Sequence, residues 1–143
     1  MKKLPFLVLI LLFCGFHLSA QSIVGKWKTI DDETNKARSI VEIYEEKGKY
    51  YGKIVDVYWD KSKGEDASAV CEKCTDDRKN KKIIGLQIIR DLEKKGNEFK
   101  NGKILDPDNG KVYDCKIWVE NGVLKVRGYV AFFFRTQNWH KFE

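Results

Sequence analysis

The chain has 143 residues and carries 27 Lys or Arg against 21 Asp or Glu, a formal net charge of +6. The lysines stand among acidic residues and form no basic stripe with interleaved aromatic residues, so the charge pattern gives no support for a nucleic-acid partner. A chain of this length forms one domain with a sizeable hydrophobic core.

Residues 1–20 have the pattern of a secretory signal peptide. Lys2 and Lys3 form a positive start, residues 4–16 are an apolar run, and the small Ala20 precedes a cleavage site. The apolar run is shorter than the ~20 residues that span a bilayer comfortably, and no second run of that length follows. We therefore expect export to the periplasm or the extracellular space, without a transmembrane span.

A second interpretation of the same segment makes Cys14 the lipidated cysteine of a bacterial lipoprotein. Leu11 stands where that signal has a leucine, but Phe13 stands where it has a small residue, so the plain signal peptide is favoured. Cleavage after Ala20 leaves one domain, residues 21–143, with 25 basic and 21 acidic residues and a net charge of +4.

The rest of the chain is predicted to form short β-strands joined by turns. Apolar and polar residues alternate, as expected for strands with one buried face. Asn121-Gly122 is a pair typical of a two-residue hairpin turn, and Pro107 lies in a second turn. In chain order, strands are predicted over residues 23–30, 38–46, 49–59, 83–92, 98–105, 111–120, 123–133 and 136–142.

Residues 85–96 permit a helix as well as a strand, because Leu86, Ile89 and Leu92 are three positions apart. The dense, β-branched character of the run favours the strand. Eight strands linked mostly by tight turns in ~120 residues predict an all-β fold, an eight-stranded antiparallel up-and-down barrel. One long polar loop, residues 60–81, interrupts the pattern.

That loop carries Cys71 and Cys74 in a CxxC motif, and Cys115 is the only other cysteine after residue 20. A disulfide is favoured, because free thiols seldom persist in exported proteins. We expect Cys71 to pair with Cys74 and Cys115 to be a buried thiol, with Cys115 as the alternative partner of either. A redox site would need the motif at a helix start, and zinc would need a fourth ligand. Redox and metal-binding functions stay open as alternatives.

Aromatic residues are more numerous than one small closed core requires. Two explanations remain open: core packing with barrel closure, or a cavity or mouth for a small hydrophobic or amphipathic ligand. Because consecutive strand residues point to opposite faces, the side chain of at least one of the phenylalanines at 132–134 should point away from the core. The candidates to line a ligand cavity are Tyr113, Trp118, Tyr129, Phe132, Phe134 and Trp139.

No residue pattern typical of catalysis stands out. His140 is interpreted as a strand residue rather than a general base, and residues 106–110 as a turn rather than a calcium loop. We expect a protein without enzymatic activity, cofactor or metal. Its leading function is ligand binding, and the alternative is an envelope interaction or stress protein whose barrel is filled by its own side chains.

The Gly-x-Trp at residues 25–27 resembles the motif that opens lipocalins and related barrels. In that family the tryptophan closes the base of the barrel, and an arginine from near the last strand packs across it. The resemblance assigns the tryptophan to Trp27 and offers Arg135 or Arg127 as the arginine.

A wider resemblance rests on five stretches of the chain, residues 25–45, 51–55, 71–86, 101–130 and 135–141. In these stretches the chain is similar to the DUF2147 family of small exported bacterial proteins. It departs from the family pattern at Lys82-Ile83, where a proline is expected, and at residues 131–136, which are shorter and more apolar than expected. The resemblance implies a calycin-like β-barrel and an envelope location, and implies no established chemistry.

Overall fold

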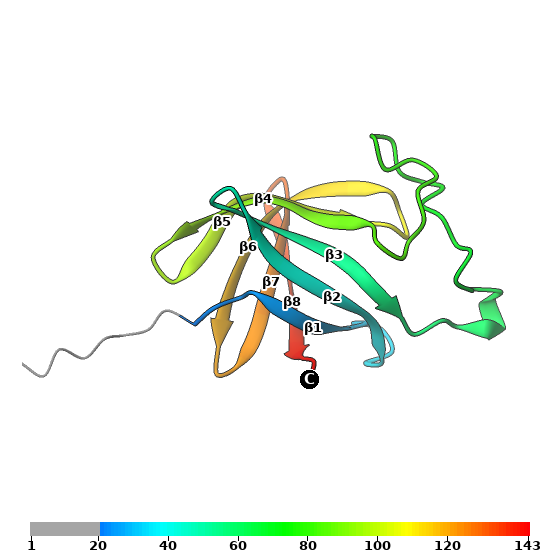
Figure 1. Ribbon diagram of the computed structural model, residues 1–143, viewed down its shortest axis with the longest axis horizontal. Helices are drawn as coiled ribbons and strands as arrows, with labels where there is room; N and C mark the ends of the chain where they lie inside the picture. Colours follow the sequence, from blue (N-terminus) through cyan, green and yellow to red (C-terminus); the bar gives the residue numbers. More distant parts are fainter. Residues whose placement is uncertain (1–20) are drawn as a thin grey trace, which may run out of the picture.

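The computed structural model describes residues 21–143, which fold into a closed barrel of eight antiparallel strands in sequence order (Figure 1). The predicted signal peptide, including Cys14, lies outside the described residues. The predicted up-and-down barrel is confirmed. Its strands are β1 (Gly25–Ile30), β2 (Ala37–Glu46), β3 (Lys49–Val57), β4 (Gln87–Lys95), β5 (Glu98–Asp106), β6 (Lys111–Glu120), β7 (Val123–Val130) and β8 (Phe133–Lys141), and one short 3-10 helix, η1 (Lys61–Lys63), lies between β3 and β4.

Alternating side chains divide the barrel wall into an inner and an outer face. In β7, Leu124 and Val126 are buried, whereas Lys125 and Arg127, which alternate with them, are half-exposed. Because successive strand residues point to opposite faces, this alternation places the apolar residues of each strand in the barrel interior. The interior core includes Trp27, Val41, Ile43, Ile54, Ile89, Leu92, Phe99, Cys115, Ile117, Leu124, Val126 and Trp139.

Several predicted strand boundaries differ from those of the structure, most clearly at β4 and at the last turn. Residues 87–95 form strand rather than helix, but β4 starts four residues later than predicted, because residues 83–86 still belong to the long loop. The turn between the last two strands falls at residues 131–132 rather than at 134–135. Ala131 takes φ 50° there. This left-handed conformation is unusual for a residue other than glycine or asparagine, so the sequence carries no signal for it.

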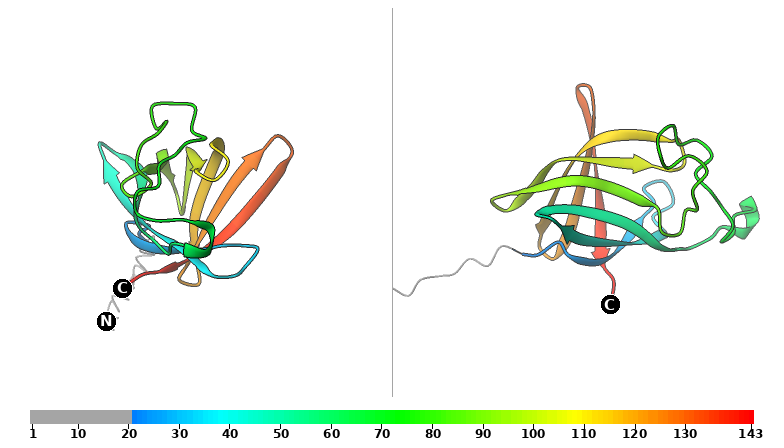
Figure 2. Two further views of the ribbon diagram at one scale, coloured as in Figure 1. Left: turned by 90° about the vertical axis from the view of Figure 1, so that its right-hand side faces the viewer. Right: turned by 45° about the horizontal axis from the view of Figure 1, so that its top comes forward.

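The up-and-down order gives the barrel two different ends. Hairpin turns 47–48, 96–97 and 121–122 lie at one end, here called the base. Connections 31–36, 58–86, 107–110 and 131–132 lie at the other, here called the open end; Figure 2, left, views the molecule from the side of the long 58–86 loop.

The barrel wall is closed least firmly between its first and last strands. Six residue pairs join β1 to β2, but two pairs join β1 to β8, Trp27 with Lys141 and Lys28 with His140. Both pairs lie near the base, because β8 runs from the open end towards the base. Towards the open end β1 and β8 therefore part, and we call the gap between them the seam.

Candidate functional site

The barrel is packed at its base, and its other end is exposed along β7 and β8. Along the inner face of β7, Leu124 is 0% and Val126 2% exposed, but Val130 at the open end is 53% exposed. Along the inner face of β8, Trp139 is 2% and Phe133 78% exposed. A fully buried side chain contacts no water-filled space, so the base is filled by protein. At the open end the exposure is on the side of β7 and β8, because the last inner-facing residues of the first three strands are buried: Thr29, Ser39 and Val57.

Apolar side chains line the upper interior. Ile104 and Tyr113 lie opposite each other on β5 and β6 and are half-buried. Gly128 on β7 faces them: a methyl group at this position would lie 3.7 Å from Tyr113 Cβ and 3.8 Å from Ile104 Cγ2, which is ordinary contact. The hydroxyl of Tyr113 accepts a hydrogen bond from Asn109 Nδ2 at 3.0 Å. Gly128 therefore has room for a methyl group beside Tyr113 and Ile104.

A polar bridge crosses the seam beside these apolar residues. The Asp32 carboxylate, from the β1–β2 connection, accepts hydrogen bonds from Arg135 Nε at 2.6 Å and from Gln137 Nε2 at 3.1 Å. Gln137 Oε1 in turn accepts from Trp139 Nε1 at 3.1 Å. Arg135, Gln137 and Trp139 share the inner face of β8, so this chain of hydrogen bonds runs from the open end down to the packed core.

Sequence reasoning missed Asp32 and Gln137. Asp32 precedes Arg135 by 103 positions, and the stretch around it reads as a polar turn. Only the closure of the barrel brings the first connection next to the last strand, so no local pattern carries this contact.

The six aromatic candidates do not line one cavity. Trp139 is buried in the core, and Tyr113 lies in the upper interior. Trp118, Tyr129 and Phe134 lie on the outer face, where the Arg127 guanidinium lies 5.0 Å from the Trp118 ring and 4.1 Å from the Phe134 ring. The turn residue Phe132 is 98% exposed. Two candidates therefore face the interior and four do not, because alternation and the unexpected turn place them elsewhere.

Trp27 is buried near the base, and the cation over its ring is a lysine rather than an arginine. It is 2% exposed, and its Nε1 donates to the carbonyl oxygen of Ile23 at 2.8 Å. The cation over its ring is Lys141, whose Nζ lies 5.8 Å from the ring centroid. The prediction of Arg127 or Arg135 is wrong, because Arg127 lies on the outer face and Arg135 bonds to Asp32 at the open end.

The CxxC motif forms a buried disulfide in the long loop. Cys71 and Cys74 are bonded, with Cα atoms 5.4 Å apart, and both residues are 1% exposed. Cys115 is a free, buried thiol on the inner face of β6. A catalytic or redox-sensing disulfide needs access for an attacking thiolate, which burial denies. The geometry supports a structural disulfide and gives no support to a redox site.

The loop around the disulfide is fixed to the barrel by charged side chains. Arg78, 3% exposed, donates to Asp76 at 3.1 Å and to the carbonyl oxygen of Gln87 at 2.9 Å. Next to it, Asp77 accepts two hydrogen bonds from Arg90 of β4, at 2.8 and 2.9 Å. These bonds lower the pKa of Asp77 to about 2.

The sequence interpretation took this segment as a solvent-exposed polar loop. The signal that it missed is the stretch Asp76-Asp77-Arg78. In this stretch Asp76, two residues before the buried Arg78, supplies the carboxylate that pairs with it. A buried guanidinium is stable only when its donors are paired, so the loop must keep this geometry.

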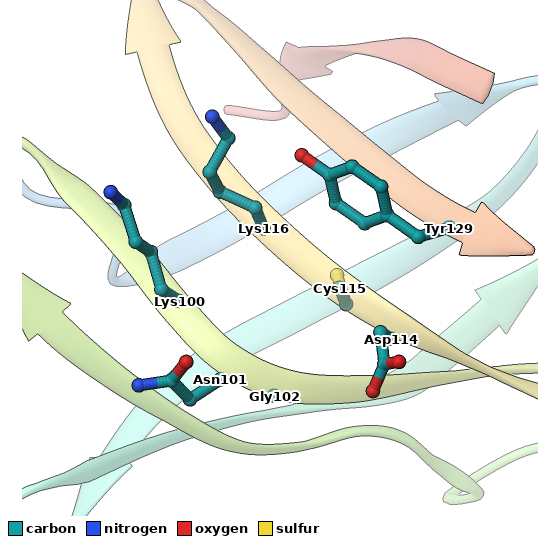
Figure 3. A pocket seen from close by; sticks show the side chains of 7 residues that line it. All are labelled: Lys100, Asn101, Gly102, Asp114, Cys115, Lys116 and Tyr129. Atoms are coloured by element: carbon teal, nitrogen blue, oxygen red, sulfur yellow. The ribbon is translucent and has the colours of Figure 1, made fainter. Parts of the chain in front are cut away.

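Two hollows lie outside the barrel lumen. One, about 360 Å³, lies over β5, β6 and β7, and Figure 3 shows Lys100, Lys116 and Tyr129 around it. The other, about 520 Å³, lies where the long loop meets β4 and is lined by Arg78, Arg90 and neighbouring residues. Glu98 pairs with Lys100 and Lys116 at the first hollow. Asp76 and Asp77 pair with the two arginines at the second, so these cations of both hollows already have partners.

Residues 21–143 contain no group of three or more His, Cys, Asp or Glu side chains arranged to hold a metal ion. His140 is exposed, paired across the strands with Lys28. In the described part of the chain, no helix has the length and apolar character needed to cross a membrane.

Three comparisons with known proteins bear on this barrel. No curated protein matches the chain in sequence. Among solved structures, protein HP1028 from Helicobacter pylori, described as belonging to the lipocalin family, matches with a TM-score of 0.71. The match covers 85% of this chain and 84% of that one at 20% sequence identity, which shows a shared fold.

The third comparison is with family models. Residues 25–141 match the family described as "Uncharacterized protein conserved in bacteria (DUF2147)". The match begins with the first strand and ends with the last, so it spans the whole barrel. The chain belongs to the DUF2147 family and has a lipocalin-like barrel.

Proposed function

We propose that this chain is an exported, non-enzymatic protein that binds a small amphipathic molecule at the open end of its barrel. The observation that carries the proposal is the change in exposure along the inner face, from 2% at Trp139 to 78% at Phe133 on one strand. A lipocalin-like barrel that is packed at its base and exposed along β7 and β8 at its other end offers a ligand a site beside these two strands rather than at its base.

The chemistry of the mouth fits an amphipathic ligand. Ile104, Tyr113 and Phe133 offer apolar surface, and Arg135 with Gln137 offers hydrogen-bond donors on the same inner face. A ligand with an acidic head group would take over the donors that now bond to Asp32, while its apolar part covers the tyrosine and phenylalanine rings.

Two observations support export. The first is the pattern of residues 1–20. The second is the Cys71–Cys74 disulfide, since such bonds persist in oxidising compartments and are rare in the cytosol.

The test is a binding measurement on residues 21–143 purified after export. A fluorescent fatty-acid analogue is titrated against the protein, and organic extracts of the fresh protein are analysed by mass spectrometry. Gly128→Leu places a side chain in the upper interior, towards Tyr113 and Ile104, and we expect it to weaken binding of the analogue at least ~10-fold. Lys125→Leu, on the outer face of the same strand, is the matched control and should bind as the wild type does.

Equal binding by the two variants would place the ligand outside the barrel and refute the proposal. If neither the analogue nor any extracted molecule binds, the packed base favours the second candidate, an envelope interaction protein with a filled barrel.

A further inference from the structure

The turn between β7 and β8 exposes the most apolar surface of the described chain. Phe132 is 98%, Phe133 78%, Phe134 60% and Val130 53% exposed. Figure 2, right, shows this hairpin rising clear of the neighbouring strands, so no other element covers its end. We call Val130, Phe132, Phe133 and Phe134 the aromatic tip. Soluble proteins rarely leave several large apolar side chains together in water, so the tip indicates a contact with another molecule or surface.

The aromatic tip presents apolar side chains on every side. Phe133 pairs with Val130 on the inner face, and Phe134 pairs with Tyr129 on the outer face. Phe132 lies in the turn itself, beyond the ends of both strands. A flat protein surface would cover one of these faces and leave the others in water. A medium that surrounds the tip, such as the apolar layer of a bilayer, covers all of them.

Positive charge lies directly behind the aromatic tip. The charged residues of the segment 126–140 are Arg127 and Arg135, with no Asp or Glu, and Lys141 lies away from the tip, beside Trp27. Arg127 lies on the outer face and Arg135 on the inner face, three to five residues from Phe132, which corresponds to ~10–15 Å along a strand. Side chains inserted at the interface reach ~5–10 Å into a bilayer, so this spacing places the two guanidinium groups at the level of the lipid phosphates.

Arg127 is suited to this position. Its Nε donates to Thr136 Oγ1 at 2.8 Å, and its guanidinium lies 4.1 Å from the Phe134 ring. The guanidinium carries further N–H donors, which can bond to phosphate. Arg135 is partly neutralised by Asp32, so Arg127 is the stronger of the two phosphate contacts.

We propose that the aromatic tip inserts into the interface of a lipid bilayer that carries anionic head groups, with Arg127 at the phosphate level. The protein then attaches to the membrane surface by this one hairpin. This inference goes beyond ligand binding, since attachment requires neither a free upper interior nor a bound ligand.

The test uses residues 21–143 and sedimentation with vesicles of phosphatidylcholine alone or mixed with phosphatidylglycerol. The wild type should sediment with the anionic vesicles at low salt and be released as salt rises, because screening weakens the attraction. Phe132→Ser with Phe134→Ser should reduce vesicle affinity at least ~10-fold, because two rings no longer enter the apolar layer. Arg127→Gln should reduce the affinity for anionic vesicles and leave the weak affinity for phosphatidylcholine unchanged.

Phe142→Ser is the matched control, because Phe142 is 37% exposed but lies after the last strand, at the base. It should bind vesicles as the wild type does. The Phe132→Ser, Phe134→Ser variant should still bind the fluorescent fatty-acid analogue in solution, which keeps this proposal separate from the proposed function.

Absence of wild-type binding to anionic vesicles at low salt would overturn the proposal, as would equal binding by the serine variant. Light scattering adds a third outcome. A dimer of the wild type that the tip substitutions dissociate, without vesicle binding, would show that a second copy of the chain covers the tip.

Discussion

Burial raises the pKa of the Cys115 thiol to about 12, far above its ordinary value. At pH 8 only about one molecule in ten thousand then carries the reactive thiolate. We predict that iodoacetamide adds no mass to native residues 21–143, one label after unfolding without reductant, and three labels after unfolding with reductant. Cys115→Ala should lose the single label. Rapid labelling of the native protein would show that the inner face of β6 is accessible.

The ion pair between Asp77 and Arg90 gives the protein a defined acid sensitivity. The pKa of Asp77 is lowered from 3.8 to about 2 by hydrogen bonds from Arg90. Since the folded-state pKa lies below the unfolded value, the stabilisation is fully present above about pH 4 and is lost as the pH falls towards 2. We predict that Asp77→Asn lowers the urea midpoint at pH 6 and that this difference from the wild type shrinks between pH 4 and 2.

Glu120→Gln, at the far end of β6, is the control for this pH dependence. Its urea midpoint should follow that of the wild type throughout. A constant difference between wild type and Asp77→Asn down to pH 2 would show that proton binding at Asp77 is not linked to folding.

At the scale of elements, the long loop is held against the β5–β6 turn by close backbone contact. Lys73 Nζ donates to the carbonyl oxygen of Asp108 at 2.9 Å. A methyl group at Gly110, whose φ is +74°, would lie 1.9 Å from the carbonyl oxygen of Lys73. No shift of a flexible side chain relieves such an overlap, so glycine is required at this position for two reasons, its φ and its closeness to the loop.

We predict that Gly110→Ala is markedly more destabilising than Gly122→Ala. Gly122 has φ +75° with nothing within 4 Å of the added carbon, so it isolates the conformational cost, about 1 kcal/mol. Gly110→Ala should cost a further ~1–3 kcal/mol from the overlap. Urea unfolding measures both, and hydrogen exchange should report faster exchange across residues 70–82 in Gly110→Ala alone. Equal costs would mean that the loop detaches from the turn without loss of stability.

Among the elements, the strands and turns that depend on local sequence patterns could be predicted from the sequence. Strand β6 and the turn at Asn121-Gly122 were predictable because alternation and turn chemistry are local. The turn at Ala131 was not, because its positive φ is imposed by the pairing of β7 with β8 and by no preference of alanine. The loop structure around Arg78 was not either, because its partner Gln87 belongs to the barrel wall and not to the loop.

For the candidate site, prediction from the sequence is limited because several contacts form only when the barrel closes. The inner orientation of Tyr113 follows from alternation within a single strand, and the sequence was sufficient for it. The bridge from Asp32 to Arg135 depends on barrel closure, and the position of Trp27 relative to Lys141 depends on the same β1–β8 register. Alternation cannot decide which cation of the last strands reaches Trp27, so the arginine inferred from the family resemblance was wrong.

At the scale of the whole molecule, the seam is the place where the barrel opens most readily. Two residue pairs join β1 and β8, and above them the Asp32 carboxylate provides the remaining connection through Arg135 and Gln137. The side chains of Asp32 and Arg135 are 33% and 66% exposed, so the bridge contributes only about 0.5 kcal/mol to global stability. Its effect on local opening should be larger than its effect on unfolding, because the strand edges that it spans have few other contacts across the seam.

We therefore predict that Asp32→Ala speeds hydrogen exchange in residues 133–139 while the melting temperature falls by no more than about 3 °C. Peptides from β6 and from the base of β7 should exchange as in the wild type, since their neighbours are unchanged. Glu33→Ala, the adjacent exposed carboxylate, is the control and should leave exchange in β8 unaltered. Unchanged exchange in Asp32→Ala would show that β8 is held by its pairing with β7 alone and that the seam is open in solution with or without the bridge.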